Sequence, residues 1–407
     1  MASTLAGDSG RNRWANADLA SRIAVLQDTS KDRQVGWALW VGFLVIMCAW
    51  VTFGPKRSVT PAYFFGAEQW VAGRPLYNPE GIGFLYLPQA AILFTPFAAL
   101  PVDVAEIAWR VVSVGVYAWG VRRLVGLAER CSGCPLFTVT TLIVLPLALS
   151  STKSGQATLP MAGLMMAAVA YLVEKNWWRA AGCLALAVAI KPLAVVLILL
   201  AAATYRPLIG RLFVALAILA LAPFLTQSPG YVQSQFMAFP EAMQYADQRS
   251  HVEYFAQLFG LLRVIGWDVS GAGKMLARGA VAIITLLSCL WCSRRIDAAR
   301  WGVYFYTLST CYLMLFNPRT ENNSYSMLAP AIGIFCAWAL REQRRKRLAL
   351  LAVVFWGTLC TFEFARLFTP KEQCIWLAPA MCLVFASCVI TDLIQERSPA
   401  AQHLAAE

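Results

Sequence analysis

The 407-residue chain is poor in charge and almost devoid of histidine, and both shortages narrow what it can be. Charged residues make up 14% of the chain and apolar residues 59%, whereas about a quarter of an average soluble domain is charged. The composition excludes an ordinary soluble protein and predicts one that is integral to a membrane. The two histidines, His251 and His403, lie far apart, so we expect no metal site, even with Glu253 near the first.

The chain also lacks a P-loop, a dinucleotide-binding fingerprint and a nucleophile elbow, so we expect no bound cofactor. Cysteine is present in twelve copies, but most lie inside apolar segments, where a thiol behaves as a small hydrophobic group. Cys131 and Cys134 form the one close pair outside such a segment. A zinc or redox role needs a second ligand pair or a thioredoxin-like context, and two incidental thiols in a loop are the favoured interpretation.

The formal net charge of +12 arises from basic residues in short connections between apolar segments, not from one patch. This is the positive-inside pattern of membrane proteins, and it argues against nucleic-acid binding. Residues 1–35 are polar and too long for a signal peptide, so we expect a disordered cytoplasmic tail. Residues 394–407 form a second cytoplasmic tail under the same topology.

Residues 36–393 are predicted to form one all-α polytopic membrane domain of about twelve transmembrane helices. Outer-face loops are expected at about 54–86, 227–275 and 317–324, with short interfacial helices. The spans are expected near 35–53, 87–100, 104–125, 136–150, 157–173, 180–203, 211–226, 277–293, 301–316, 325–341, 348–365 and 376–393.

Lys191 and Pro192 interrupt one of these apolar segments in its middle. A lysine at mid-span cannot easily extend to the surface, so it should face a cavity or an anion. Proline removes a backbone donor and tends to kink the helix there. The alternative is a purely structural lysine that pairs with a carboxylate on another helix.

Three polar residues in connections are further candidates. Glu321 follows Arg319 in the sequence NPRTENNSY between two spans, and ionisable groups at membrane depth are often functional. The alternative is an ion pair between these two residues that caps a helix end. Glu68 projects from the polar side of a predicted amphipathic helix in the first loop, where a solvated surface is the simpler explanation. Gln156 opens another span and could bind a polar head group.

Three stretches, taken in order, resemble glycosyltransferase family 87, membrane enzymes of the GT-C fold that use polyprenyl-phosphate sugars. They read AGRPLYNPEGIGFLYLPQAAILFTPFAALP at 72–101, SGQATLPMAGLMMAAVAYL at 154–172 and RAAGCLALAVAIKPLAVVLILLAAATYRP at 179–207. The resemblance covers roughly residues 36–340. It implies a bacterial inner-membrane enzyme with an active site on the periplasmic face, which transfers a hexose with inversion and without a metal to an envelope glycan or lipid.

Such a reaction needs a base for the acceptor hydroxyl and cations for the departing lipid phosphate. Under the resemblance, the candidate bases are Glu321 and then Glu68. The candidate phosphate-binding cations are Lys191, Arg319, Arg57 and Arg74. The candidate residues of the sugar and lipid pocket are Tyr63, Tyr86, Gln156, Asn323 and Tyr325.

The chain departs from the family pattern in two places. Family members usually carry an aspartate soon after the first span, but residues 57–63 read RSVTPAY, with no acid. The mannosyltransferase branch tends to carry a histidine where this chain has Thr320-Glu321-Asn322. Either the base has moved, or the chain binds a glycolipid without transferring sugar, as a binder or flippase. A scaffolding subunit of an envelope-assembly complex is a third hypothesis.

The twelve-span topology contains one conflict. If 136–150, 157–173 and 180–203 are all full spans, Gln156 lies on the cytoplasmic side, far from a donor phosphate. A broken or re-entrant segment at Lys191 and Pro192 would alter these depths.

Overall fold

The structure, a computed structural model, describes residues 29–54, 58–77, 83–249, 255–361 and 375–395. All regular secondary structure in these ranges is helical, as the sequence predicts. The α-helices are α2 (Thr29–Phe53), α3 (Thr60–Val71), α4 (Pro88–Ala98), α5 (Val102–Ser132), α6 (Phe137–Lys153), α7 (Thr158–Val173), α8 (Trp177–Ile190), α9 (Val195–Thr204), α10 (Ile209–Leu221), α11 (Pro229–Arg249), α12 (Leu258–Val264), α13 (Gly271–Cys292), α14 (Ala298–Phe316), α15 (Ala329–Arg341), α16 (Arg345–Cys360) and α18 (Leu377–Gln395). Short 3-10 turns are η1 (Pro192–Ala194), η2 (Arg206–Leu208), η3 (Ala222–Leu225) and η5 (Asn322–Met327).

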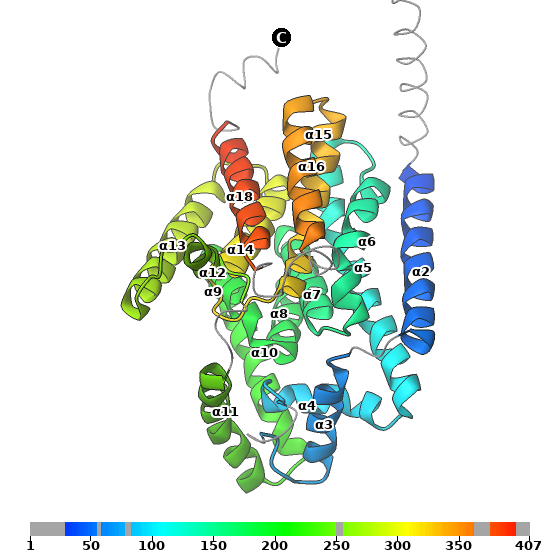
Figure 1. Cartoon of the computed structure of the whole chain (residues 1–407), viewed down its shortest axis with the longest axis vertical. Coiled ribbons are helices and arrows are strands. Elements are labelled where there is room, and N and C mark those ends of the chain that lie inside the picture. The colour runs from blue at the N-terminus through cyan, green and yellow to red at the C-terminus, as the bar shows by residue number, and fades with distance from the viewer. Residues whose placement is uncertain (1–28, 55–57, 78–82, 250–254, 362–374, 396–407) are drawn as a thin grey trace, which may run out of the picture.

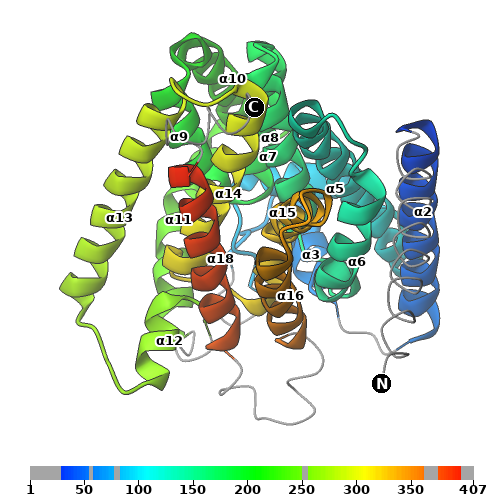
Figure 2. The same cartoon turned by 90° about the horizontal axis from the view of Figure 1, so that it is seen from above.

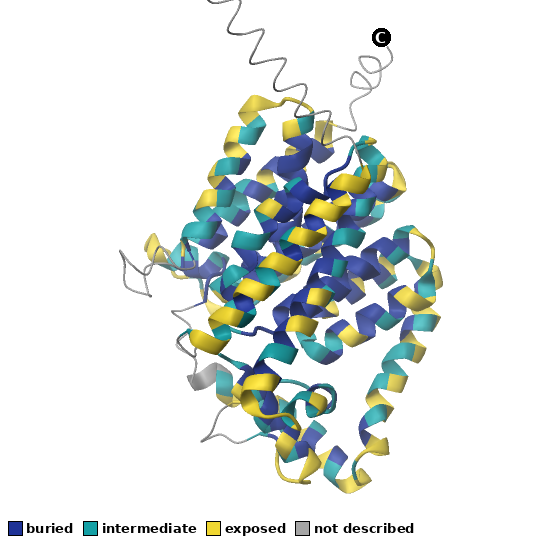
Figure 3. Ribbon diagram, turned by 90° about the vertical axis from the view of Figure 1, so that its right-hand side faces the viewer, coloured by how far each residue is buried: buried dark blue, intermediate teal, exposed yellow. Residues whose placement is uncertain are grey.

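Five of the described helical segments are long and apolar enough to cross a membrane, and shorter apolar helices pack between them. The five are Thr29–Phe53, Val102–Ser132, Arg206–Leu225, Gly271–Cys292 and Leu377–Gln395. The predicted number of twelve full-length spans is therefore not reproduced. Seen from above, α2 and α13 lie at opposite margins of the bundle (Figure 2). Buried residues concentrate in its interior, and exposed residues follow the outward faces (Figure 3).

The centre of the bundle is α7, most of whose residues are buried. It packs against α5 at a point where two glycines meet. A Cβ atom at Gly120 would lie 2.3 Å from the carbonyl oxygen of Gly163, so only glycine allows this approach. Small residues at helix crossings are how membrane helices pack closely without a hydrophobic driving force between them.

One end of the bundle, which we call the basic end, carries the arginine-rich turns. Asp32 near the start of α2 accepts hydrogen bonds from the backbone N–H groups of Phe137 and Thr138 at 3.0 and 3.1 Å, which joins it to the start of α6. Arg341 at the end of α15 donates to the carbonyl of Pro135 at 3.3 Å. The opposite end, the cavity end, carries α3, α4 and α11 (Figure 1).

The predicted span at 87–100 is wrong. The helix found there, α4, has 11 residues and measures about 16 Å at 1.5 Å per residue, roughly half of the hydrocarbon core. It stays at the cavity end, where it packs on α3. Removing this crossing reverses the direction of α5, α6 and α7. Gln156, in the turn between α6 and α7, consequently lies at the cavity end, which resolves the conflict in the predicted topology.

The predicted span at 180–203 is also not one helix. Lys191 has extended backbone angles (φ −152°, ψ 124°), and it ends α8 before η1 and α9 begin. The ring of Tyr205, just beyond α9, lies 6.1 Å from that of Trp177 at the start of α8. The chain therefore returns to the basic end as a helical hairpin whose tip is Lys191 and Pro192. This second correction restores the predicted direction of α10 and of all later helices.

Candidate functional site

A cavity of about 870 Å³ opens at the cavity end, and it gathers residues that are distant in the sequence. Its walls come from the start of α3, the loop before α4, the α6–α7 turn, the tip of the α8–α9 hairpin, α13 and the end of α14. Six of the eleven predicted site residues line it: Tyr63, Tyr86, Gln156, Lys191, Arg319 and Glu321.

The loop that carries Glu321 is held firmly on both sides. The backbone N–H of Ala256 donates to the carbonyl of Thr320 at 2.7 Å. The hydroxyl of Ser150 on α6 donates to Oδ1 of Asn323 at 2.7 Å, and the hydroxyl of Ser151 donates to the Asn323 carbonyl at 2.6 Å. Asn323 was predicted as a pocket residue, but these contacts turn it toward α6. The result is a fixed backbone from which the exposed Glu321 side chain faces the cavity.

Gln156, in the described part of the chain, donates a hydrogen bond to the Glu321 carboxylate. Its Nε2 lies 3.4 Å from Oε2 of Glu321, which is a long hydrogen bond. The turn that presents Gln156 depends on Gly155, whose φ of +67° disfavours any side chain. A Cβ atom at Gly155 would also lie 2.7 Å from Cγ2 of Thr60.

Tyr63 and Tyr86 form a pair of hydroxyl groups on the cavity wall. The hydroxyl of Tyr63 accepts hydrogen bonds from the Tyr86 hydroxyl at 3.2 Å and from the Ala157 backbone N–H at 3.1 Å. Both lone pairs of that oxygen are thus used, and its own proton is left to donate. Burial raises the pKa of Tyr63 to about 12 and that of Tyr86 well above its usual value. Both tyrosines lie outside the spans and stay neutral donors at ordinary pH.

Three cations face the cavity together with the single carboxylate of Glu321, counting its described lining residues. Lys191, at the hairpin tip, donates from Nζ to the Thr158 hydroxyl at 3.0 Å. The guanidinium of Arg319 lies 5.7 Å from the ring centroid of Phe255. The third cation, Arg278 on α13, was not predicted, because it falls inside an expected span. The excess of positive charge suits an anionic ligand.

A buried ion pair behind the cavity wall was also missed. Glu106 and Arg110, one helical turn apart on α5, are in direct contact. The Glu106 carboxylate also accepts hydrogen bonds from the hydroxyls of Ser58 and Thr60, and Arg110 donates to the Lys153 carbonyl at 3.0 Å. The pair ties α5 to the wall segment that begins at Ser58. The sequence did indicate this pair, because Glu106 and Arg110 are an acidic and a basic residue four positions apart inside an apolar segment.

The other predicted residues that the structure describes do not line the cavity. Glu68 is exposed on α3 and does not line it. Arg74 is exposed, and its carbonyl accepts a hydrogen bond from the Tyr231 hydroxyl at 2.6 Å. Tyr325 is fully buried and donates to the Ala256 carbonyl at 3.0 Å. Arg57 lies outside the described residues, as do His251 and Glu253.

The described lining thus combines a carboxylate, neutral hydroxyl and amide donors, and cations with apolar side chains such as Leu193 and Phe316. Such a set can hold a phosphate, hydrogen-bond a sugar and accept a proton, with an apolar wall for a hydrocarbon chain. Across the described ranges, no group of three histidine, cysteine, aspartate or glutamate residues could hold a metal ion.

Known proteins of two kinds are similar to parts of this chain. A polyprenol-phosphate-mannose-dependent alpha-(1-2)-phosphatidylinositol mannoside mannosyltransferase of Mycobacterium tuberculosis is 33% identical over 138 residues, which are 28% of this chain and 30% of that protein. The match thus spans less than a third of that relative. Crystal structures of ArnT from Cupriavidus metallidurans, apo and bound to undecaprenyl phosphate, align over 89% and 88% of this chain and 78% and 77% of theirs, at 12% and 15% identity and a TM-score of 0.42.

The strongest comparison is with a family model. The model of glycosyltransferase family 87 matches residues 84–318, more than half of the chain. This range contains Tyr86, Gln156, Lys191 and Arg278, and it ends one residue before Arg319. By the extent of this match, the chain belongs to glycosyltransferase family 87.

Proposed function

We propose that this protein transfers a monosaccharide from a polyprenyl-phosphate carrier to an envelope glycan or lipid at the outer face of a bacterial inner membrane. The observation that carries the proposal is the cavity, where Glu321 lies among three cations and two neutral tyrosine hydroxyls. A lipid-linked sugar phosphate needs this combination of an anion site, donors for sugar hydroxyls and an apolar path. The mycobacterial relative, which depends on polyprenol-phosphate-mannose, supports the donor class.

The distribution of charge supports the orientation. The turns around Arg294 and Arg295 and from Arg341 to Arg347 lie at the basic end, opposite the cavity. Short basic connections stay on the cytoplasmic side of a membrane. The cavity then faces the periplasm, and the start of α2 and the end of α18 face the cytoplasm.

The proposed reaction is a single displacement. Glu321 takes the proton from an acceptor hydroxyl, and that oxygen attacks the anomeric carbon of the donor sugar. The bond between this carbon and the phosphate oxygen breaks on the opposite side, so the configuration inverts. The departing lipid phosphate carries the negative charge, which Lys191, Arg278 and Arg319 stabilise.

The other lining residues position the donor. The Tyr63 hydroxyl has one proton to donate, and the Gln156 amide can hydrogen-bond both the sugar and Glu321. Leu193, Val196 and Phe316 provide the apolar wall along which the first isoprene units lie. The stretch 58–63 lines the cavity with Ser58, Val59, Pro61, Ala62 and Tyr63. It contributes no carboxylate, so the base in this proposal is Glu321.

The test is transfer by the purified protein in proteoliposomes, with polyprenyl-phosphate sugars labelled in the sugar. We expect labelled sugar in an acceptor fraction with the opposite anomeric configuration. Retained configuration would contradict the single displacement. Movement of labelled donor across the bilayer with no product would instead identify a flippase. Binding of the donor without product and without movement across the bilayer would identify a non-catalytic binder. Proteins that co-purify stably, with no lipid bound, would identify a scaffolding subunit.

A further inference from the structure

A second cavity lies at the basic end, far from the candidate active site. It has a volume of about 850 Å³ and lies between the first turns of α16 and one face of α18. Its basic part consists of Arg344, Arg345, Lys346 and Arg347. Its other wall consists of Leu350, Val384, Ser387, Cys388, Thr391 and Gln395, with Gln343 at the rim.

The four cations of this cavity divide into two pairs. Arg347 contacts the buried carboxylate of Asp392, and Arg344 lies 3.8 Å from the same carboxylate and 2.6 Å from Glu342. These two arginines are neutralised and fix α16 against α18. Arg345 and Lys346 are exposed, and in the described part of the chain neither has a carboxylate within ion-pair distance. The cavity therefore has two positive charges without a counter-ion in the described protein.

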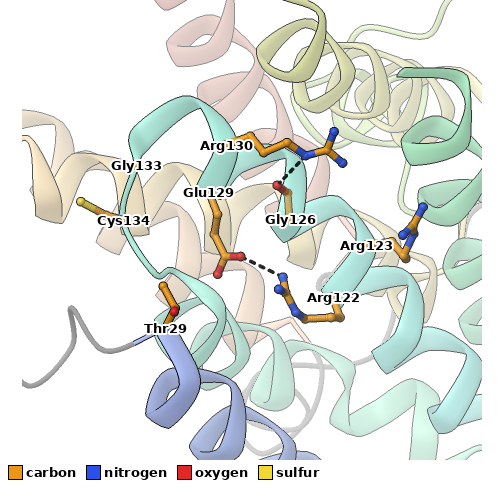
Figure 4. Close-up of a pocket in the computed structure, with 8 residues that line it drawn as sticks. All are labelled: Thr29, Arg122, Arg123, Gly126, Glu129, Arg130, Gly133 and Cys134. Atoms are coloured by element: carbon orange, nitrogen blue, oxygen red, sulfur yellow. Dashed lines mark hydrogen bonds and ion pairs between the residues drawn. The ribbon is translucent and has the colours of Figure 1, made fainter. Parts of the chain in front are cut away.

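Another basic pocket at the same end shows the contrast. It has a volume of about 520 Å³ and is lined by Arg122, Arg123 and Arg130 of α5 (Figure 4). Arg122 binds Glu129 at 2.9 Å, and Arg123 and Arg130 both bind Glu174, at 2.5 and 2.8 Å. Each arginine is already paired, so this pocket has little capacity for an external anion.

The cavity between α16 and α18 continues into an apolar outer surface. Leu350 and Val353 on α16 are 41% and 57% exposed, and Ile390 and Ile394 on α18 are 47% and 60% exposed. Large aliphatic groups on the outside of a membrane bundle face lipid chains. The unpaired cations therefore lie where the hydrocarbon-facing surface meets the cytoplasmic end.

We propose that this cavity binds the head group of an anionic phospholipid. The phosphate would lie against Arg345 and Lys346, and an acyl chain would follow Leu350 and Val384 toward the bilayer. The occupant is a phospholipid and not a protein or nucleic acid, because the charged rim is continuous with the apolar surface. Basic pockets between membrane helices on the cytoplasmic side suit such head groups.

The test measures lipid-dependent thermal stability of the full-length protein in detergent micelles. Phosphatidylglycerol, phosphatidylcholine and inorganic phosphate are titrated separately, because a ligand that binds only the folded state raises the unfolding temperature saturably. We expect saturable stabilisation by phosphatidylglycerol alone. In the variant R345Q/K346Q, the half-saturating concentration of phosphatidylglycerol should rise about thirtyfold, because each basic group near an anionic lipid contributes to the free energy of binding.

Two further variants separate the site from general charge. Arg294 and Arg295 are exposed in a turn at the same end and do not line this cavity, so R294Q/R295Q removes equal charge and should leave the titration unchanged. Ser387→Trp fills the cavity without changing charge and should weaken binding as strongly as the double variant. Equal weakening in both double variants, or equal stabilisation by phosphatidylcholine, would overturn the proposal. A saturable response to inorganic phosphate would also overturn it, in favour of a free-anion site.

Discussion

Two carboxylates at the cavity end, Glu106 and Glu321, have opposite surroundings. Glu106 is buried, contacts Arg110 and accepts hydrogen bonds from two hydroxyls. Glu321 is exposed to the cavity, and among the described residues its carboxylate accepts the long hydrogen bond from Gln156. The first carboxylate has its hydrogen-bonding capacity occupied by the protein, whereas the second retains capacity for a substrate. This difference identifies Glu106 as structural and Glu321 as the candidate base.

The largest expected effect is on catalysis by Glu321. Glu321→Gln keeps the shape and the hydrogen bond but cannot take a proton, so kcat for sugar transfer should fall about 10²- to 10⁴-fold. The thermal unfolding temperature should change little, because this carboxylate is exposed. Glu68→Gln is the matched control and should keep full activity. Full activity in Glu321→Gln would remove it as the base.

The next largest effect should be on stability. Arg110→Met leaves the Glu106 carboxylate buried without its cation, which costs about 3–5 kcal/mol of unfolding free energy. The double variant Glu106→Gln/Arg110→Met removes both charges and should recover part of this loss. Thermal unfolding in detergent measures both. If Arg110→Met unfolded at the wild-type temperature, the ion pair would have no structural role.

A smaller loss of stability is expected from a substitution in the α6–α7 turn, which lies between the surroundings of Glu106 and Glu321. Gly155→Ala places a side chain at φ +67° and against Thr60, which should cost about 1–3 kcal/mol. Since this turn presents Gln156, donor binding should weaken as well. Gly115→Ala on α5 is the control, because a Cβ atom there meets nothing within 4 Å. Similar unfolding temperatures for the two variants would show that the turn tolerates a side chain.

The smallest expected effect concerns Tyr63. Tyr63→Phe keeps the ring and removes the hydroxyl that has a proton for the substrate and accepts hydrogen bonds from Tyr86 and Ala157. Transfer should slow about tenfold for the lost hydrogen bond to the substrate. Because burial raises the pKa of Tyr63 to about 12, the hydroxyl remains protonated below that pH. The ratio of wild-type to variant rates should therefore stay constant from about pH 6 to pH 10, where an ordinary tyrosine begins to ionise. A ratio that falls toward one near neutral pH would contradict a buried neutral donor.

Much of the fold could be predicted from hydrophobicity, because every described membrane helix must be apolar along its length. The two topological errors have a common physical origin. The sequence of α4 is as apolar as a span, but it buries its apolar residues against the aromatic cluster of α3 instead of lipid. The two arms of the α8–α9 hairpin are as apolar as one continuous span would be, so hydropathy does not distinguish them from it. Only the charged Lys191 and the cyclic Pro192 at the tip indicate the hairpin.

The site was predicted in part for a similar reason. Residue type indicated Lys191, Arg319 and Glu321, since charge at membrane depth needs a reason. The type of a residue does not show in which direction its side chain points. Asn323 was therefore expected to face the cavity, although Ser150 and Ser151 of α6 hold it away. Arg278 was missed because position within a span hides which face a residue occupies. Glu106 and Arg110 formed a detectable pair, but their partner hydroxyls come from a distant segment.

The short α8–α9 hairpin also sets the depth at which the proposed reaction would take place. The 14 residues of α8 extend about 21 Å from the basic end, whereas a typical hydrocarbon core is about 30 Å thick. Under the proposed mechanism, a donor phosphate that contacts Lys191 would lie below the level of the neighbouring lipid head groups. The thickness of the surrounding bilayer would then affect donor binding, because a thicker hydrocarbon core places the charged phosphate deeper below the head groups.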